Sequence, residues 1–367
     1  MSRIVIDARE SGTSTGRHID KLMEHLHKLK PRGEIILLTR PTRVEFFQKV
    51  TPGFKILSSD YKEFSFAEQL GFARQLYSLK PDLVHFMKAN QPVLYFGRCV
   101  TTVHDLTTTR FRNPAKPFLI FKIKQMIYRL VTVWVAHKSK HIITISEFVK
   151  NDLVHFARIS PSKITVTYLA ADKIIEPALQ IDKLEGVKFI MYVGRPQPHK
   201  NLQRLIDAFV VLQTEHPELH LVLAGKKDVL YDRFEQYIKK QGIKNVMFTG
   251  FISEGQLRWL YENTAAYVFP SLSEGFGLPG LEAMAHGAPV VSSNATCLPE
   301  IYGDAAHYFD PLDIGDMATK IGEVITSPAL SVELIKKGQT QTAKYSWSRM
   351  ATQTLDIYNK AIARRKT

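Results

Sequence analysis

Two glutamates in the second half of the chain have a spacing that suits sugar binding. Glu274 and Glu282 are eight positions apart, and the glycine-rich run GFGLPGL lies between them. Gly275 and Gly277 let the backbone approach a ligand closely, and Pro279 favours the first turn of a helix. We therefore expect Glu274 on a loop and Glu282 near the start of a helix. Carboxylates chelate vicinal hydroxyls, so the pair could hold a ribose and a hexose together.

A second candidate site is the cationic loop in VGRPQPHKNL. Arg195 and Lys200 stand near the two ends of this loop, which follows a predicted strand and leads into a predicted helix. Two cations at a helix N-terminus suit a diphosphate and could neutralise the charge that a divalent metal neutralises elsewhere. The alternative is that both are solvated charges on a loop. The chain has no Asp-x-Asp, so we expect no metal site and no cofactor.

The first half contains a weaker candidate for phosphate binding. Gly12 and Gly16 bracket a loop, ESGTSTGRHI, that follows the first predicted strand and opens a helix. Backbone amides at a helix N-terminus suit an anionic oxygen, and the alternative is a turn that needs glycine for its geometry. Neither half contains G-x-G-x-x-G or a Walker sequence, which counts against a dinucleotide dehydrogenase and a kinase-type nucleoside triphosphatase.

Short apolar strands alternate with helical patterns along the whole chain, which predicts an α/β fold with parallel sheets covered on both faces. The pattern breaks at about 172–186 and then restarts, so we predict two doubly wound, Rossmann-like domains, 1–172 and 187–347, facing a cleft. An amphipathic helix is predicted at 348–364. The predicted strands are 3–8, 35–39, 83–86, 99–104, 141–145 and 164–168, then 188–194, 219–225, 245–250, 265–270 and 288–293.

Length and composition agree with this organisation. The 367 residues suit two domains, and the 45% hydrophobic and 23% charged residues are typical of globular proteins. No apolar run is long enough to span a membrane, and we expect no signal peptide. The two cysteines, Cys99 and Cys297, exclude a disulfide scaffold and favour a reducing, cytoplasmic environment.

The positive charge is concentrated in the first half. The formal net charge is +14, and residues 1–185 carry +12 of it, with 29 Lys+Arg against 17 Asp+Glu. An anionic partner is therefore expected to meet this half. Between residues 106 and 146 there is no acidic residue, and basic side chains alternate with large apolar ones. This stretch fits an anionic membrane surface that presents a lipid-linked acceptor, and equally a core helix with solvated lysines.

The segment around the two glutamates resembles the Glu-seven-residues-Glu motif of retaining glycosyltransferases of family four, which have the GT-B fold. The resemblance extends over nearly the whole chain and is strongest at Arg195–Lys200, at 270–293 and in LPEIYGDAAHYFDP (298–311). It is weaker at Gly16-Arg17, TVHDL and ITISEF. Pro-His-Lys-Asn after Arg195 is similar to mannosyltransferases that use GDP-mannose and build surface polysaccharides.

The resemblance implies a nucleotide-sugar donor bound mainly by the second domain and a glycan or polyprenyl-linked acceptor bound mainly by the first. It implies retention at the anomeric carbon, with no metal required, and a final helix, 348–367, that packs back on the first domain. Together with the cysteine content and the basic stretch 106–146, this favours an enzyme in the cytoplasm, peripheral at the inner face of the membrane. In the first loop, many members have two adjacent glycines where this chain has Ser11-Gly12 and Thr15-Gly16.

Roles for single residues follow from the same resemblance. Arg195 and Lys200 would clamp the diphosphate, Glu282 would bind the ribose, and Glu274 would bind hydroxyls of the transferred sugar. His104, in TVHDL, would lie near that sugar, and the alternative is a packed or N-capping histidine at a strand end. The other implied donor contacts are the amides of Phe276, Gly277 and Leu278, the base-lining Gly225, Phe251 and Ile252, and Gly16.

Three alternatives stay open at this point. A UDP-sugar could replace GDP-mannose as the donor. A nucleotide-sugar epimerase of similar fold would turn over the donor without any acceptor. A basic nucleic-acid-binding protein would explain the charge of the first half, but the chain has no recognisable RNA- or DNA-binding motif, so we expect no nucleic-acid partner.

Overall fold

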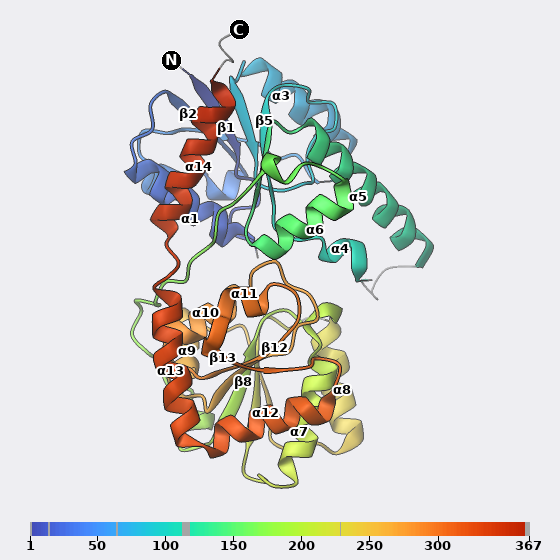
Figure 1. Ribbon diagram of the computed structural model, residues 1–367, viewed down its shortest axis with the longest axis vertical. Helices are drawn as coiled ribbons and strands as arrows, with labels where there is room; N and C mark the ends of the chain where they lie inside the picture. Colours follow the sequence, from blue (N-terminus) through green and yellow to red (C-terminus); the bar gives the residue numbers. More distant parts are fainter. Residues whose placement is uncertain (1, 14, 64, 112–117, 228, 364–367) are drawn as a thin grey trace. The chain divides into compact units, whose positions relative to one another are not determined.

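The computed structural model describes residues 2–363 except 14, 64, 112–117 and 228. The chain divides into two compact units, and each is built on one parallel β-sheet with helices packed against it (Figure 1). The predicted α/β class with two parallel, Rossmann-like sheets is confirmed. Residues 112–117 of the basic stretch 106–146 and residues 364–367 of the predicted last helix lie outside the described residues.

Unit 1 comprises the described parts of 2–110, 118–169 and 346–363. Its sheet has seven strands in the order β3-β2-β1-β4-β5-β6-β7, and every pair is parallel. The strands are β1 (Arg3–Asp7), β2 (Glu34–Thr39), β3 (Lys55–Ser58), β4 (Leu83–Phe86), β5 (Cys99–Val103), β6 (His141–Thr144) and β7 (Ile164–Val166).

The helices of unit 1 bury apolar stripes of the kind that the sequence predicts. In α1, for example, Ile19, Leu22 and Leu26 are buried. The last helix, α14, packs on α1, and Tyr358 of α14 hydrogen-bonds to His85 of β4 at 2.6 Å (Figure 1). The helices are α1 (Gly16–Lys28), α2 (Val44–Val50), α3 (Ala73–Ser78), α4 (Thr107–Arg110), α5 (Phe118–Lys138), α6 (Glu147–Ala157) and α14 (Trp347–Ile362), with short turns η1 (Pro41–Arg43), η2 (Glu68–Phe72) and η3 (Pro161–Lys163).

Unit 2 comprises residues 170–345, as far as they are described, together with Phe111. It has six strands in the order β10-β9-β8-β11-β12-β13, again all parallel. The strands are β8 (Phe189–Val193), β9 (His220–Ala224), β10 (Val246–Gly250), β11 (Ala266–Phe269), β12 (Val290–Ser293) and β13 (Ala306–Phe309). The helices are α7 (Leu202–Gln213), α8 (Val229–Gln241), α9 (Glu254–Asn263), α10 (Leu278–Ala285), α11 (Leu298–Tyr302), α12 (Ile314–Thr326) and α13 (Pro328–Thr342), with turns η4 (Asp182–Leu184), η5 (Pro198–Lys200) and η6 (Gly303–Ala305).

Two strands differ from the sequence-based prediction, because neither β3 nor β13 was expected. Both lie at an edge of their sheet. Lys55 and Ser58 at the ends of β3 are exposed, and His307 and Tyr308 in β13 are half-buried. The edge strands β7 and β10 were predicted, so edge position alone does not explain the difference. Polar residues at the exposed or half-buried positions of β3 and β13 leave these two strands without a continuous apolar run.

The carboxyl ends of the strands position the predicted site residues. In a doubly wound parallel sheet, ligands bind just beyond these ends. His104 follows β5, Arg195 follows β8, and Gly225 follows β9. Among the described residues, no helix is both long enough and apolar enough to span a bilayer.

Candidate active site

A direct contact between two predicted site residues lies at the centre of the unit 2 site. Lys200 Nζ and Glu274 Oε1 are 2.5 Å apart, and both side chains are largely buried, with 19% and 13% of their surface exposed. Lys200 ends the turn η5 after β8, and Glu274 lies on the loop after β11. Because an ammonium has three donors and a carboxylate has two acceptor oxygens, each group keeps capacity for a ligand. The pair can therefore face phosphate and sugar hydroxyls at the same time.

Asn201 fixes the loop that carries Lys200. Its backbone adopts a left-handed conformation, with φ of 59°. Its buried Nδ2 donates to the carbonyl oxygens of Pro270 and Pro311, at 3.1 and 2.8 Å. Pro270 directly follows β11, and Pro311 lies two positions after the end of β13. The amide therefore ties the β8–α7 loop to two other strand ends. The lysine is thus held on a rigid support.

The backbone of Glu274 is held from both sides by two consecutive residues. Its N–H donates to Thr296 Oγ1 at 3.1 Å, and its carbonyl accepts from Cys297 Sγ at 3.3 Å. Thr296 has φ of 57°, which is uncommon for a β-branched residue and indicates local strain. Burial, aided by the nearby Glu274 carboxylate, raises the pKa of the Cys297 thiol, so the thiol stays protonated as a donor.

The glycine-rich loop rests on the hydroxyl of Tyr302. This hydroxyl donates to the Gly277 carbonyl at 2.5 Å. Gly277 has φ of 90°, and a Cβ at Gly277 or Gly280 would approach the same hydroxyl to within 2.4 or 2.3 Å. Both positions therefore require glycine for packing. The Phe276 side chain is buried against Tyr345, so only its backbone can reach a ligand.

Helix α10 carries the second predicted glutamate. It begins at Leu278, with Pro279 in its first turn as expected. Glu282 lies within this helix, and its side chain is 8% exposed. A carboxylate that is so nearly buried needs partners, because desolvation of a charge is costly unless hydrogen bonds compensate for it. The helix thus presents a largely desolvated carboxylate just beyond the glycine-rich loop.

The other predicted donor contacts lie at the ends of β8, β9 and β10. Arg195 is exposed, and its guanidinium has no hydrogen bond or ion pair within the described part of the chain. Gly225 has φ of 156°, and a Cβ there would meet the Gly194 carbonyl at 2.5 Å. Phe251 is 85% exposed, and Ile252 is half-buried. These residues lie just beyond the carboxyl ends of three neighbouring strands, and the exposed phenyl ring of Phe251 is available to a planar group.

In unit 1, His104 contacts a second histidine that the sequence did not single out. His104 Nε2 and His18 Nδ1 are 2.9 Å apart, and the rings meet edge to face. Burial lowers the pKa of His104 to about 4, with a further lowering by Lys88 and opposing effects of Asp105 and Glu10. Burial, followed by the charge of His104, also lowers the pKa of His18. Both rings are therefore neutral near pH 7, and one of them donates its ring N–H to the other.

Gly16 begins α1, and local packing explains its requirement for glycine. Its N–H donates to the Thr13 carbonyl at 3.0 Å. A Cβ at this position would approach the Glu10 carbonyl oxygen to within 2.6 Å. This N–H is occupied within the loop, so the donor contact expected of Gly16 stays a prediction. Gly16 and His104 belong to unit 1, whereas the other predicted site residues belong to unit 2.

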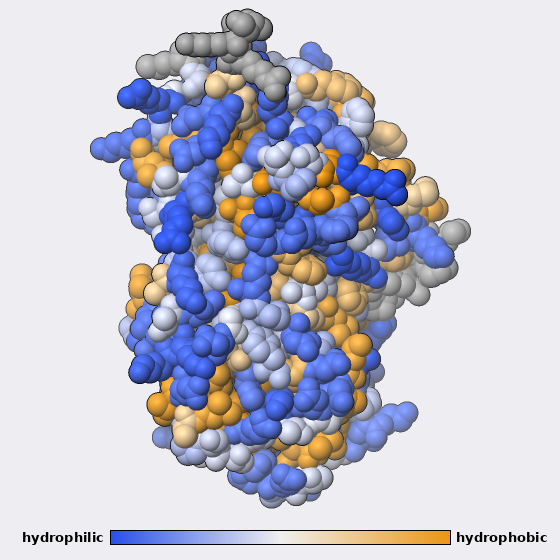
Figure 2. All heavy atoms as spheres, viewed as in Figure 1, coloured by the Kyte–Doolittle hydropathy of each residue, from blue (hydrophilic) through white to orange (hydrophobic). Residues whose placement is uncertain are grey.

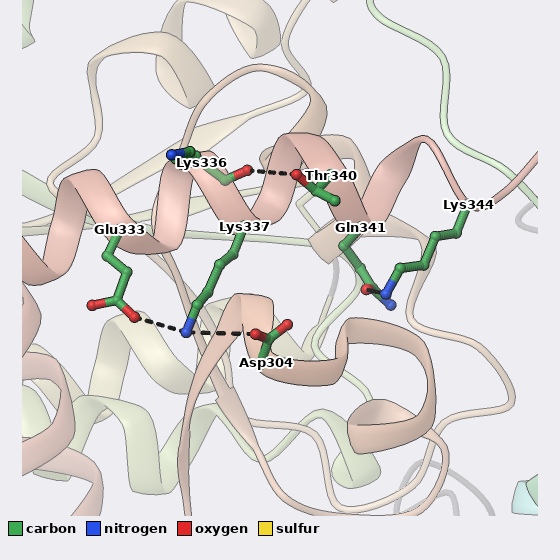
Figure 3. A pocket seen from close by; sticks show the side chains of 7 residues that line it. All are labelled: Asp304, Glu333, Lys336, Lys337, Thr340, Gln341 and Lys344. Carbon is green, nitrogen blue, oxygen red and sulfur yellow. Dashed lines mark hydrogen bonds and ion pairs between the residues drawn. The ribbon is translucent and has the colours of Figure 1, made fainter.

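A cavity of about 340 Å³ lies elsewhere in unit 2, against α13 (Figure 3). None of the predicted site residues lines it. Lys337, at its centre, already forms ion pairs with Glu333 at 2.7 Å and Asp304 at 3.5 Å. In the described residues, no group of three or more His, Cys, Asp or Glu side chains is arranged to hold a metal ion.

Several residues that position the site were missed at the level of sequence. They are His18, Asn201, Thr296, Cys297 and Tyr302. Asn201 could have been suspected, because asparagine tolerates the left-handed conformation and often stands next to a helix. The other four act through contacts between residues far apart in the chain, such as the contact between Glu274 and Thr296. No local sequence pattern predicts such contacts.

Both halves of the chain match families of glycosyltransferases. Residues 15–173 match the family described as Glycosyltransferase Family 4, and residues 178–341 match Glycosyl transferases group 1. Among curated proteins, the chain is 29% identical over 274 residues to the O-antigen chain mannosyltransferase B of Escherichia coli. That alignment covers 71% of this chain and 70% of the relative.

Solved structures share the fold. The sucrose-phosphate synthase of Thermosynechococcus elongatus superposes with a TM-score of 0.78 at 17% identity, covering 98% of this chain and 99% of that one. The Anabaena protein Alr3699/HepE, solved in complex with UDP-glucose, superposes with a TM-score of 0.75 at 14% identity, covering 98% and 100% of the two chains. Together, the matches confirm the predicted GT-B fold and favour a transferase over the epimerase and nucleic-acid-binding alternatives.

Proposed function

Since the chain is a glycosyltransferase of family four with the GT-B fold, we propose that it transfers a hexose with retention from a nucleotide-sugar to a growing surface polysaccharide or glycolipid. The preferred donor is GDP-mannose. The observation that carries the proposal is the 2.5 Å contact between Lys200 and Glu274, because it joins a phosphate-binding cation to a sugar-binding carboxylate. The similarity of the chain to an O-antigen mannosyltransferase supports the choice of mannose as the sugar and of a surface polysaccharide as the product.

In this proposal, the donor lies along the carboxyl ends of the unit 2 strands. Lys200 and the exposed Arg195 bind the diphosphate, and Glu282 accepts hydrogen bonds from the ribose hydroxyls. Glu274 and the amides of Phe276, Gly277 and Leu278 hold the transferred sugar. Gly225, Phe251 and Ile252 border the base. The rigid support of Lys200 and Glu274 favours this role, because preorganised charges need no rearrangement as the reaction proceeds.

The proposed chemistry is attack from the face that the diphosphate leaves. The bond between the anomeric carbon and the diphosphate oxygen breaks, and the acceptor oxygen bonds to the same face. The departing diphosphate oxygen takes the proton of the acceptor hydroxyl. Lys200 and Arg195 stabilise the negative charge that develops on the diphosphate, so no metal is needed in this scheme. His104, which its lowered pKa keeps neutral near pH 7, could donate or accept a hydrogen bond with a sugar hydroxyl.

The acceptor is proposed to be a glycan carried on a polyprenyl or similar lipid. Such an acceptor is presented at a membrane surface, so the enzyme would work in the cytoplasm as a peripheral protein at the inner face of the membrane. The basic stretch 106–146 is the part of the chain that suits this location, because it contains no acidic residue.

A UDP-sugar is the second candidate donor. The solved structure of the Anabaena protein contains UDP-glucose, and its chain superposes on nearly the whole of this one. The strand-end residues that would border a base are Gly225, Phe251 and Ile252, and a glycine, a phenyl ring and an aliphatic side chain do not by themselves distinguish guanine from uracil.

A transfer assay tests the proposal. The full chain is incubated in EDTA with GDP-mannose, UDP-glucose or ADP-glucose and with lipid-linked oligosaccharides, and the anomeric configuration of the product is read by NMR. We expect transfer from one donor, with GDP-mannose preferred, and a product that keeps the α-configuration of the donor. A β-linked product, or strict dependence on a divalent metal, would overturn the proposed mechanism.

A further inference from the structure

Helix α5 turns an apolar stripe toward solvent, and we propose that this stripe docks the protein flat on an anionic lipid bilayer. Five large apolar side chains of one helix are between 46% and 64% exposed. They are Ile123, Met126, Ile127, Leu130 and Trp134. Exposed apolar residues that occur singly are normal, whereas a contiguous group marks an interaction surface.

The five side chains lie on one face of the helix. Their spacing of three, four, seven and eleven positions from Ile123 keeps them within a sector of about 100°, because successive residues turn by about 100°. The opposite face packs on unit 1 through Thr132, Val135 and Ala136, which are buried. Lys138 Nζ also ties the end of α5 to the Pro92 and Tyr95 carbonyls, at 3.1 and 2.9 Å. The stripe therefore points away from the body of unit 1.

Basic side chains flank the stripe on both sides. Lys124 lies on one flank and Lys122 and Arg129 on the other, about 100–120° from Ile123 around the helix, and all three are exposed. No acidic residue occurs between 106 and 146. Hydrophobic and strongly hydrophilic side chains alternate over the edge of the molecule that α5 occupies in Figure 1, as Figure 2 shows at its upper right.

This arrangement matches a bilayer surface with acidic headgroups. A helix that lies in the interface buries its apolar face in the acyl boundary, and its cations contact the lipid phosphates on either side. Trp134 fits the same site, because tryptophan prefers the boundary between lipid and water. Among the described residues no helix can span a bilayer, so α5 is expected to lie along the surface. A protein partner with an apolar groove would have no need of cations along both edges.

This inference rests on the proposed function in one respect: membrane binding by α5 would bring the active site to a lipid-linked acceptor. The binding itself is a property of α5. The two proposals can therefore fail separately, and vesicle binding is measured without donor, acceptor or turnover.

The test is flotation of the full chain with vesicles of phosphatidylcholine alone or with 30% phosphatidylglycerol (about one lipid in three). Leu130→Asp places a charge in the stripe, and its matched control is Leu312→Asp, since both leucines are 64% exposed and Leu312 lies in unit 2. Lys122→Glu combined with Lys124→Glu removes the flanking charge, with Lys336→Glu, an exposed lysine of α13, as the control.

We expect the wild type to bind the anionic vesicles at least tenfold better than the neutral ones. Leu130→Asp and the double lysine variant should each lose at least tenfold in binding, and the controls should behave like the wild type. The blue shift of tryptophan emission on anionic vesicles should disappear in Trp134→Phe. Equal binding by Leu130→Asp and the wild type would overturn the inference. Self-association that Leu130→Asp abolishes, without vesicle binding, would assign the stripe to a second copy and overturn it as well.

If nucleotide binding fails while vesicle binding persists, the proposed transferase site is wrong and the docking face stands. If vesicle binding fails while donor binding persists, only the docking face is wrong. Thermal unfolding of every variant, compared with the wild type, shows that the changes act at the surface and not through loss of the fold.

Discussion

Lys200 Nζ lies 2.5 Å from Glu274 Oε1, and the two residues come from loops at the ends of different strands, β8 and β11. The contact holds the cation and the carboxylate side by side at the ends of these two strands. Such a pair combines the two functions that a nucleotide-sugar requires, which are charge neutralisation at phosphate and hydrogen bonding to hydroxyls.

Replacement of Lys200 by alanine should reduce turnover far more than it impairs folding. We expect kcat to fall by about 100-fold or more, because removal of one preorganised charge typically costs a few kcal/mol of transition-state stabilisation. Glu274 is only 13% exposed and loses its cationic partner, so the variant should also be less stable, and kcat is measured well below its melting temperature. Lys227→Ala is the control, because Lys227 is a surface lysine of the same unit that pairs with Glu235. Unchanged turnover in Lys200→Ala would contradict the diphosphate assignment.

Replacement of Glu282 by alanine should weaken nucleotide binding specifically. Loss of hydrogen bonds from ribose hydroxyls to a carboxylate should raise Kd about 10- to 100-fold, as measured by calorimetry with the nucleoside diphosphate. At saturating donor, turnover should change much less. Glu262→Ala on α9 is the control, because Glu262 forms a surface ion pair with Arg258. If Glu282→Ala left the nucleotide affinity intact, the ribose role would be wrong.

Thr296 should matter through its hydroxyl, which accepts the Glu274 N–H. Thr296→Val keeps the shape of the side chain and leaves this N–H without its partner, whereas Thr296→Ser keeps the hydroxyl. We expect Val to lower kcat/KM for the donor about tenfold and Ser to remain close to the wild type, since one lost hydrogen bond is worth about 1 kcal/mol or slightly more. Equal activity of the two variants would show that the contact does not position Glu274.

The buried histidines of unit 1 should make stability depend on pH. Burial lowers the pKa of His85 to about 3, with a further lowering by His104. In the unfolded chain the pKa would be near 6.5, so below about pH 6.5 the unfolded state binds a proton that the folded state does not. The free energy of unfolding should therefore fall as the pH drops from about 6.5 toward 3, by about 2 kcal/mol at pH 5 for this group.

Urea unfolding of the wild type and His85→Asn at pH 7 and pH 5 measures this effect. The variant should be less stable at pH 7, because His85 bonds to Tyr358 and Thr102, and it should lose less stability on acidification. His18 and His104 also have lowered pKa values, so part of the pH dependence should persist in the variant. An identical loss of stability in both proteins would contradict the lowered pKa of His85.

The positions of the central strands along the chain could be predicted from sequence, because each is a largely apolar run buried on both faces. Strand β4 (Leu83–Phe86), for example, has the predicted bounds. Strands β3 and β13 were missed, because polar residues such as Lys55, Ser58 and His307 leave them without a continuous apolar run. The sequence indicated that glycine is needed in the loop after Glu274, and we expected the reason to be close approach to a ligand. In the structure, a side chain at Gly277 would collide with the hydroxyl of Tyr302.

For the site, the sequence singled out residues whose chemistry is explicit, such as Lys200 and Glu274. It did not predict that they touch, because the contact joins loops more than seventy residues apart. The sequence also did not predict the residues that hold Lys200 and Glu274 in place. Thr296 is an ordinary residue by type, and its role follows from a backbone conformation and a hydrogen bond that only the folded chain defines.

Titration of the full chain with GDP, UDP and ADP in EDTA tests the central claim most directly, with a short RNA as a comparison. The account predicts that one diphosphate binds without metal, with GDP preferred, and that Lys200→Ala and Glu282→Ala each weaken this binding at least tenfold. If no diphosphate binds, or if both variants bind it as well as the wild type, unit 2 does not hold the donor in the proposed way.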